Sequence, residues 1–299
     1  MMQLPQFVKI VEVGPRDGLQ NEPQRIDTDI KVEFINRLSL TGLSSIEATS
    51  MVSPKWIPQL ADSEEVYRSI QRHENITYPV LVPNLQGLER ALRVGAQEIA
   101  VFTAASQTFS QKNTHCSIED SLKRIESVVE MCQQHNIRIR AYLSCVLGCP
   151  YEGQIKLRDV SRLVNQLYEM GCTEISLGDT IGMGTPLQAQ TLINEASQSV
   201  PLDRLAVHFH DTRGQALANI FACLQQGITI VDCSVAGLGG CPYANGATGN
   251  VATEDVVYML HGMGIKTGID LEKLLSVGRY ISQQLGRVNQ SKLGRLGDE

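Results

Sequence analysis

The segment VHFHD carries two histidines, His208 and His210, separated by one phenylalanine. In a β-strand, residues i and i+2 face the same side, so the two imidazoles would point together while Phe209 faces the other way. Two imidazoles at close range repel each other when both are protonated, but together they can bind one cation. We therefore predict that His208 and His210 are ligands of a metal ion.

Two further residues supply oxygen atoms that would complete such a site. Asp17 follows an apolar run near the N-terminus, and Asn250 ends the glycine-rich segment GLGGCPYANGATGN. A set of two nitrogens and two oxygens without a thiolate suits a divalent ion with open positions, Mg²⁺ or Mn²⁺, better than a closed structural zinc site. The two imidazoles leave Mn²⁺, Co²⁺ and catalytic Zn²⁺ open as alternatives.

Cys241 differs from the other seven cysteines because it follows the glycines of GLGG and precedes a proline. The sequence has no CxxC pair, and scattered cysteines in such a chain are mostly buried apolar residues without disulfides. Cys241 is either another small packed residue or, as we favour, a general acid, base or nucleophile on a mobile lid.

Three more charged residues occur where apolar runs end. Arg16 stands beside Asp17 in the stretch VEVGPRDGLQNE, and Glu47 and Asp179 lie in two other runs. Glu47 and Asp179 either take part in the chemistry or orient Arg16 and the histidines, and we favour the supporting role.

The elements that must position these residues are recurrent β-rich runs with helical stretches between them. The predicted strands cover 7–13, 43–49, 76–82, 98–104, 138–145, 173–178, 205–210 and 229–236. In 120–134, apolar residues recur with helical spacing. Glycines before several of the strands, as in TGLSS and MGCTE, predict helix ends.

Eight strand–helix units predict a (β/α)8 TIM barrel, with a doubly wound open sheet as the alternative. We favour the barrel because the count is eight and no dinucleotide fingerprint follows the first strand. Catalytic groups of such barrels sit at the C-terminal ends of the strands, where the residues above occur. We expect one domain, 1–299, with one or two extra C-terminal helices after about 265, and the cysteine loop over the C-terminal mouth of the barrel.

Composition excludes several classes of partner. The net charge is −6 and no run of lysines and arginines occurs, so nucleic acid is not expected to bind. No apolar stretch reaches the roughly 18–20 residues of a membrane span. The N-terminus shows neither a secretory nor a transit signal, so we expect a cytoplasmic protein.

Five segments, in order along 7–290, closely resemble the 3-hydroxy-3-methylglutaryl-CoA lyases, members of the DRE-TIM metallolyases. They are VEVGPRDGLQNE, IEATSMVSPKWIPQLAD, SLGDTIG, VHFHDTRGQALAN and SVAGLGGCPYANGATGN. The resemblance implies cleavage of 3-hydroxy-3-methylglutaryl-CoA to acetyl-CoA and acetoacetate, as in leucine degradation. It also implies an acyl-CoA substrate and a homodimer.

The resemblance assigns roles to matching positions. It makes Asp17, His208, His210 and Asn250 the metal ligands, Arg16 the contact to the acyl-CoA, and Cys241 the essential cysteine on a flexible loop. Glu47 and Asp179 match acidic residues near the site. We expect Arg16 and Asp17 to serve opposite ends of the broken bond rather than to pair with each other. Asp17 and His208 are both candidates for the base that deprotonates the substrate hydroxyl.

Three other functions fit parts of the pattern. A lyase for a longer branched thioester, such as 3-hydroxy-3-isohexenylglutaryl-CoA, would use the same site with a roomier pocket. A condensing synthase of the same superfamily is disfavoured by the GGCPYANGATGN segment and by the absence of a long regulatory domain. A non-catalytic acyl-CoA or metal-binding barrel would not need Arg16, Asp17, both histidines and Cys241 together.

Overall fold

The computed structural model describes residues 4–240 and 249–296. Within these ranges nine short strands form one parallel sheet in the order β2-β1-β9-β8-β7-β6-β5-β4-β3. The strands are β1 (Lys9–Glu12), β2 (Ser45–Ile46), β3 (Thr49–Ser50), β4 (Val80–Leu81), β5 (Glu98–Ala104), β6 (Arg138–Ser144), β7 (Glu174–Asp179), β8 (Leu205–Phe209) and β9 (Ile230–Cys233).

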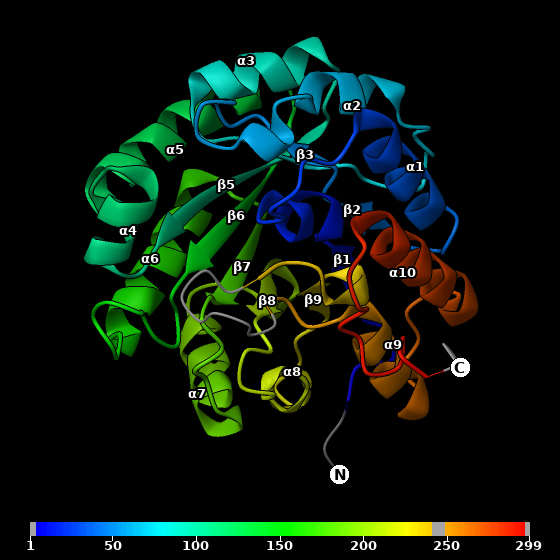
Figure 1. Ribbon diagram of the computed structural model, residues 1–299. Helices are drawn as coiled ribbons and strands as arrows, with labels where there is room; N and C mark the ends of the chain where they lie inside the picture. Colours follow the sequence, from blue (N-terminus) through cyan, green and yellow to red (C-terminus); the bar gives the residue numbers. More distant parts are fainter. Residues whose placement is uncertain (1–3, 241–248, 297–299) are drawn as a thin grey trace.

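The two ends of this sheet belong to one stretch of chain, because only Glu47 and Ala48 separate β2 from β3. On one side the Glu47 N–H donates to Glu12 O (2.8 Å), and on the other the Ala48 N–H donates to Pro79 O (2.9 Å). The stretch therefore bridges β1 and β4, and the sheet closes into the predicted parallel barrel rather than an open sheet. Figure 1 shows the strands at the centre with the helices around them.

The predicted strand at 43–49 is the clearest difference between expectation and structure. It is two strands of two residues each, because the chain changes neighbours at Glu47 and Ala48. The predicted strand at 76–82 shrinks to β4, since Pro79 and Pro83 lack the N–H that a ladder needs. The run at 229–236 ends as β9, and the helical turn η4 (Val235–Gly237) follows it.

Ten α-helices lie within the described ranges, and most of them follow a strand. They are α1 (Thr28–Ser39), α2 (Ser63–Ser69), α3 (Leu85–Arg93), α4 (Gln107–Thr114), α5 (Ile118–Gln134), α6 (Leu157–Met170), α7 (Pro186–Ala196), α8 (Ala216–Leu224), α9 (Thr253–Gly262) and α10 (Leu271–Leu285). The short helical turns η2 (Pro58–Leu60) and η3 (Leu202–Arg204) lie between them. The helix predicted over 120–134 is confirmed as α5, which buries Leu122, Ile125, Val128, Val129 and Cys132.

The glycine predicted to end the helix before MGCTE is confirmed as the C-cap of α6. Gly171 has a φ of 111°, which favours a residue without a Cβ, and its N–H donates to Leu167 O and Tyr168 O. This left-handed residue stops the helix and turns the chain into β7. The position matters for the site, because β7 lies beside β8, which carries His208.

The strands separate an apolar layer from a partly polar barrel interior. Val207 and Phe209 belong to the main apolar cluster that packs strands against helices. The alternate residues face inward, where Val11, Val13, Ala206 and Ile230 form a small cluster of their own. Phe209 therefore faces the helices and His208 the interior, as the alternation predicted. The seven described cysteines are buried and free of disulfides.

After α9 the chain forms α10, which packs against α1, α9 and η4. The segment that follows returns to the barrel, where Gln290 N–H donates to Ala236 O (3.0 Å). Figure 1 places this red segment beside β1 and α9. Among residues 4–240 and 249–296, no helix combines the length and apolar character needed to cross a membrane.

Candidate active site

The turn after β1 brings Arg16 and Asp17 into the barrel mouth. This turn, η1 (Gly14–Gly18), is a single π-helical turn in which the N–H groups of residues 16, 17 and 18 all point at Val13 O, at 3.2, 2.8 and 3.2 Å. Pro15 restricts the start of the turn, and Gly14 N–H donates to Glu12 Oε1 (2.8 Å). The stiff turn therefore ends the strand with a cation and an anion side by side.

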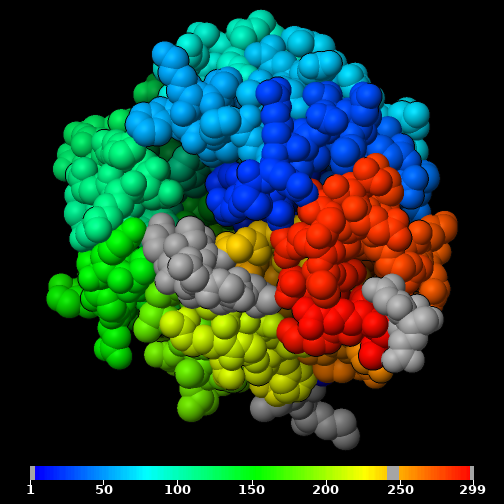
Figure 2. Space-filling view, viewed as in Figure 1, coloured from blue at the N-terminus to red at the C-terminus, as the bar shows by residue number. Residues whose placement is uncertain are grey.

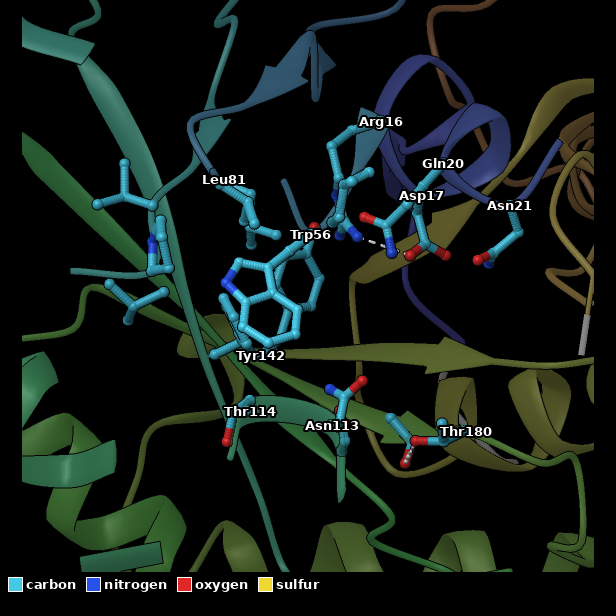
Figure 3. A pocket seen from close by; sticks show the side chains of 18 of the residues that line it. Arg16, Asp17, Gln20, Asn21, Trp56, Leu81, Asn113, Thr114, Tyr142 and Thr180 are labelled. Atoms are coloured by element: carbon cyan, nitrogen blue, oxygen red, sulfur yellow. Dashed lines mark hydrogen bonds and ion pairs between the residues drawn. The ribbon is translucent and has the colours of Figure 1, made fainter. Parts of the chain in front are cut away.

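Arg16 is fixed by two carboxylates. Its Nε donates to Glu47 Oε2 (2.8 Å), and its Nη1 donates to Asp17 Oδ1 (2.6 Å), as the dashed line in Figure 3 shows. The expectation that Arg16 and Asp17 do not pair with each other is therefore wrong. Both side chains extend from one tight turn in the same direction, so they contact each other in the ligand-free protein. Tyr142 O–H also donates to Glu47 Oε2 (3.1 Å).

Glu47 sits where a supporting role requires it. Its side chain is fully buried, and its contacts are with Arg16 and Tyr142. Burial raises the pKa of the Glu47 carboxyl, and Arg16 opposes that rise. The kink between β2 and β3 thus places the Glu47 carboxylate in contact with Nε of Arg16.

Asp17, His208 and His210 form a compact group at the barrel mouth. One ligand atom from each residue lies within 4.8 Å of the others. Burial raises the pKa of the Asp17 carboxyl, but Arg16, the two histidines and the Asn250 hydrogen bond together lower it to about 2. Burial lowers the pKa of His210 to about 4, with His208 acting in the same direction. An ionised carboxylate beside a neutral imidazole is the state in which both can bind a cation.

Asn250 joins this group through Asp17. Its Nδ2 donates to Asp17 Oδ2 (2.7 Å), which leaves the amide oxygen as the atom that a cation would use. Among the described residues, Nδ1 of His208 and Nδ1 of His210 are buried without a hydrogen-bond partner. The donor set of two imidazoles, one carboxylate and one amide oxygen fits a bound divalent ion.

Asp179 is not placed as the supporting role required. Its carboxylate accepts hydrogen bonds from Met183 N–H (3.0 Å) and Gly184 N–H (2.8 Å). Burial raises the pKa of this carboxyl, and those backbone donors oppose the rise. Asp179 therefore holds the turn after β7 together, and its side chain orients neither Arg16 nor the histidines.

Cys241 lies outside the described residues. The two ends of its segment do lie together, since Gly249 N–H donates to Gly239 O (3.1 Å). Asn250, which follows directly, faces Asp17. The chain thus enters and leaves this segment at the edge of the proposed metal site.

Four residues that the sequence interpretation did not single out belong to the same site. They are Asp232 on β9, Arg140 and Tyr142 on β6, and Ser176 on β7. Arg140 Nη1 and Nη2 both donate to the Asp232 carboxylate, at 2.9 and 2.5 Å. The Tyr142 ring meets the His208 ring edge-on, with centroids 5.9 Å apart. The sequence feature that could have identified Asp232 and Arg140 is a charged residue inside an apolar run, as in TIVDCSV and RIRAYLSC.

A cleft of about 1150 Å³ opens above these residues. Figure 2 shows the surface hollowed between the blue η1 segment and the green segments near α4. Arg16, Asp17, His208 and His210 line its inner part, and Figure 3 shows Trp56 and Asn113 nearby. Arg25 and Arg124 also line the cleft and bring positive charge to it.

Comparisons with known proteins identify the family. The sequence model of the HMGL-like family matches residues 7–281. The chain is 56% identical to "3-hydroxy-3-methylglutaryl-CoA lyase, cytoplasmic" of Rattus norvegicus, over 98% of this chain and 85% of that protein. It is also 56% identical to "Hydroxymethylglutaryl-CoA lyase, mitochondrial" of Macaca fascicularis, over 99% of this chain and 91% of that protein.

Solved structures agree with the sequence relatives. The hydroxymethylglutaryl-CoA lyase from Pseudomonas aeruginosa superposes with a TM-score of 0.97 at 54% identity, covering 99% of this chain and 98% of that one. An HMG-CoA lyase from Acinetobacter baumannii, in complex with coenzyme A and 3-methylmalate, gives a TM-score of 0.94 at 40% identity, covering 99% and 97%. These matches confirm the resemblance seen in the five motifs, and the chain belongs to the HMGL-like family, in which hydroxymethylglutaryl-CoA lyases are its relatives.

Proposed function

We propose that this protein is a divalent-metal-dependent lyase that cleaves 3-hydroxy-3-methylglutaryl-CoA to acetyl-CoA and acetoacetate. One observation carries the proposal: Arg16 and the group of Asp17, His208 and His210 meet at the inner end of one large cleft. The proposal is supported by 56% identity to relatives named for this activity. Arg25 and Arg124 in the cleft suit the phosphate groups of an acyl-CoA.

The reaction breaks the bond between C2 and C3 of the acyl group. The tertiary hydroxyl on C3 loses a proton, the electron pair of the broken bond becomes an enolate of acetyl-CoA, and that enolate is protonated at carbon. Asp17, His208, His210 and Asn250 would hold Mg²⁺ or Mn²⁺, and such an ion would polarise the hydroxyl and lower its pKa. Asp17 and His208, which belong to one compact group at the barrel mouth, are the two candidates for the base that accepts the hydroxyl proton.

Arg16 serves the other end of the broken bond. Glu47 and Asp17 fix its Nε and Nη1, so the guanidinium enters the cleft in one orientation. Donors on a preorganised guanidinium stabilise the negative charge that grows on the thioester oxygen, typically by about 3–4 kcal/mol per donor. Cys241, on the segment whose ends meet beside Asn250, is the proposed acid that protonates the acetyl carbon.

The decisive experiment measures acetoacetate release from 3-hydroxy-3-methylglutaryl-CoA by the purified protein, before and after removal of divalent ions with EDTA. We expect activity to vanish on chelation and to return with Mg²⁺ or Mn²⁺. Activity that survives thorough chelation would contradict the role of the metal, and no release under any condition would refute the lyase. Faster cleavage of 3-hydroxy-3-isohexenylglutaryl-CoA would instead assign the longer substrate.

A further inference from the structure

A buried carboxylate lies directly behind His208. Asp232 on β9 is the register partner of His208 on β8, and both side chains face the barrel interior. The Asp232 side chain has no exposed surface, and its Oδ2 lies 3.4 Å from His208 Nδ1. This separation is not a hydrogen bond in the ligand-free structure, since among the described residues His208 Nδ1 has no hydrogen-bond partner. Hydrogen bonds of this kind are often long in ligand-free sites and shorten when the site is loaded.

Asp232 is itself held in one orientation. Arg140 donates to both of its oxygens, Nη1 to Oδ2 at 2.9 Å and Nη2 to Oδ1 at 2.5 Å. Ser176 O–H donates to Oδ2 at 2.7 Å. Three donors from β6 and β7 therefore fix the plane of the carboxylate and aim Oδ2 at the imidazole on β8. Burial of so many charged groups has a cost in stability, so packing alone does not account for the arrangement.

The two nitrogens of His208 face different groups. Its Nε2 lies 3.9 Å from Asp17 Oδ2, on the side of the proposed metal ion, and its Nδ1 faces Asp232. An ionised carboxylate accepts hydrogen bonds and donates none. A proton on Nδ1 would therefore be bound by Asp232, which leaves the lone pair of Nε2 directed to the cation.

We propose that Asp232 is a positioning residue for the metal site, which holds His208 in the Nδ1–H tautomer and fixes its ring so that Nε2 faces the cation. Arg140 and Ser176 act one step further back, by orienting Asp232. The inference rests on the proposed metal-dependent function. It concerns His208 in particular, because Asp232 Oδ2 lies 3.4 Å from the Nδ1 atom of that residue.

The test uses Asp232→Asn and two measurements that need no substrate. Titration of the variant with Mn²⁺, followed by electron paramagnetic resonance of the free ion, should show affinity weakened about 10- to 100-fold, the usual effect of losing such a partner. Nitrogen-15 NMR of the Mg²⁺-loaded protein should show the Nδ1–H form of His208 in the native chain and its loss in the variant. The signals of His210 should keep their tautomer.

Glu174→Gln is the matched control. Glu174 accepts from Arg140 Nε and from Lys9 Nζ, so the variant also removes a carboxylate beside Arg140, but one on the side away from His208. We expect its Mn²⁺ affinity to stay within about twofold of the native value. Equal weakening in Glu174→Gln would show that the charge balance of Arg140 matters, and would overturn the proposal.

A double variant covers the case in which Asp232→Asn does not fold because Arg140 is left without its partner. Arg140→Met with Asp232→Asn removes both charges, and replacing a buried pair is usually better tolerated than breaking it. Native Mn²⁺ affinity with an unchanged His208 tautomer, in whichever variant folds, would overturn the proposal. Because neither measurement uses the thioester, failure of the lyase assay and failure of this inference are distinguishable.

Discussion

Arg16 is a charged residue whose position is set by two anions before any substrate binds. Glu47 and Asp17 hold it at 2.8 and 2.6 Å, and the side chain is nearly buried. For Arg16→Gln we expect kcat to fall by at least about 10²- to 10³-fold, because one preorganised donor to a developing oxyanion is typically worth that much. Steady-state kinetics with saturating Mg²⁺ would measure the loss, and circular dichroism would confirm the fold.

Arg68→Gln on α2 is the control for that substitution. Arg68 makes an exposed i,i+4 ion pair with Glu64 (3.2 Å), far less buried than Arg16. Exposed pairs of this kind contribute little, so its kcat should match the native value. Near-native turnover in Arg16→Gln would remove the guanidinium from the proposed chemistry.

The residues found by sequence interpretation share one property: local pattern alone reveals them. His208 and His210 follow from strand alternation, and Arg16 and Asp17 from their place at the end of an apolar run. Asp232 and Arg140 escaped because their role comes from pairing with each other between strands β6 and β9, which are far apart in the sequence. Their function depends on which strands are neighbours in the sheet. The pairing of His208 on β8 with Asp232 on β9 is set by strand register, which a local sequence pattern does not predict.

At the scale of the element, the π-helical turn η1 is the piece that aims Arg16 and Asp17. A Cβ on Gly18 would lie 2.7 Å from Leu238 Cβ and 2.9 Å from Ser234 Oγ, so this face of the turn packs directly on η4. For Gly18→Ala we expect a loss of stability of about 1–3 kcal/mol from overpacking. We also expect kcat/KM to fall more than tenfold, since the turn must shift. Urea unfolding and steady-state kinetics would measure the two effects.

Gly262→Ala is the matched control for that change. Gly262 is the last residue of α9. A Cβ added there would have no tertiary neighbour within 4 Å, and the backbone of Gly262 is not in the left-handed region. Alanine there should leave activity unchanged and leave stability equal or slightly higher, because glycine is the poorer helix former. If Gly18→Ala behaves like Gly262→Ala, the turn does not depend on its close packing against η4.

The elements also show where sequence patterns lose precision. Helix α5 matched its predicted span closely because its apolar residues repeat over many turns. The predicted strand at 43–49 split because Glu47 and Ala48 bond to different neighbours, Glu12 of β1 on one side and Pro79, which precedes β4, on the other. That kink closes the barrel and places Glu47 against Arg16. A local sequence pattern does not predict that consecutive residues will hydrogen-bond to different strands.

At the scale of the whole molecule, the count of eight strand–helix units was enough to favour a barrel. Closure itself is a long-range property, visible in the hydrogen bonds of Glu47 and Ala48. The polar interior was not predicted, since apolar strands give no sign that Arg140 and Asp232 meet between them. The apolar layer between strands and helices stabilises the fold, so the barrel mouth can hold charged groups.

The start of α9 contains a buried carboxyl with a raised pKa. Glu254, at the start of α9, is fully buried, and both of its oxygens lie 2.9 Å from Ala236 N. Burial raises the pKa of Glu254 to about 8, and the nearby Glu12 and Asp255 act in the same direction. In the unfolded chain this carboxyl returns to its ordinary pKa of about 4.3.

The sign of the effect follows from proton counting. Between those two pKa values the folded protein holds a proton that the unfolded chain has released, so stability falls as pH rises toward about 8. Glu254→Gln cannot ionise and keeps an acceptor for Ala236 N–H. Its free energy of unfolding, relative to the native chain, should therefore rise between pH 6 and pH 9 by an amount on the order of a few kcal/mol.

Urea unfolding of both chains at pH 6, 7, 8 and 9 would measure that difference. Glu119→Gln on α5 is the control, because its carboxylate is mostly exposed and pairs with Lys123 on the surface. The Glu119 variant should differ from the native chain by the same small amount at every pH. A Glu254→Gln difference that is equally flat would mean that the buried carboxyl keeps one charge state throughout, and that folding of this barrel does not depend on its protonation.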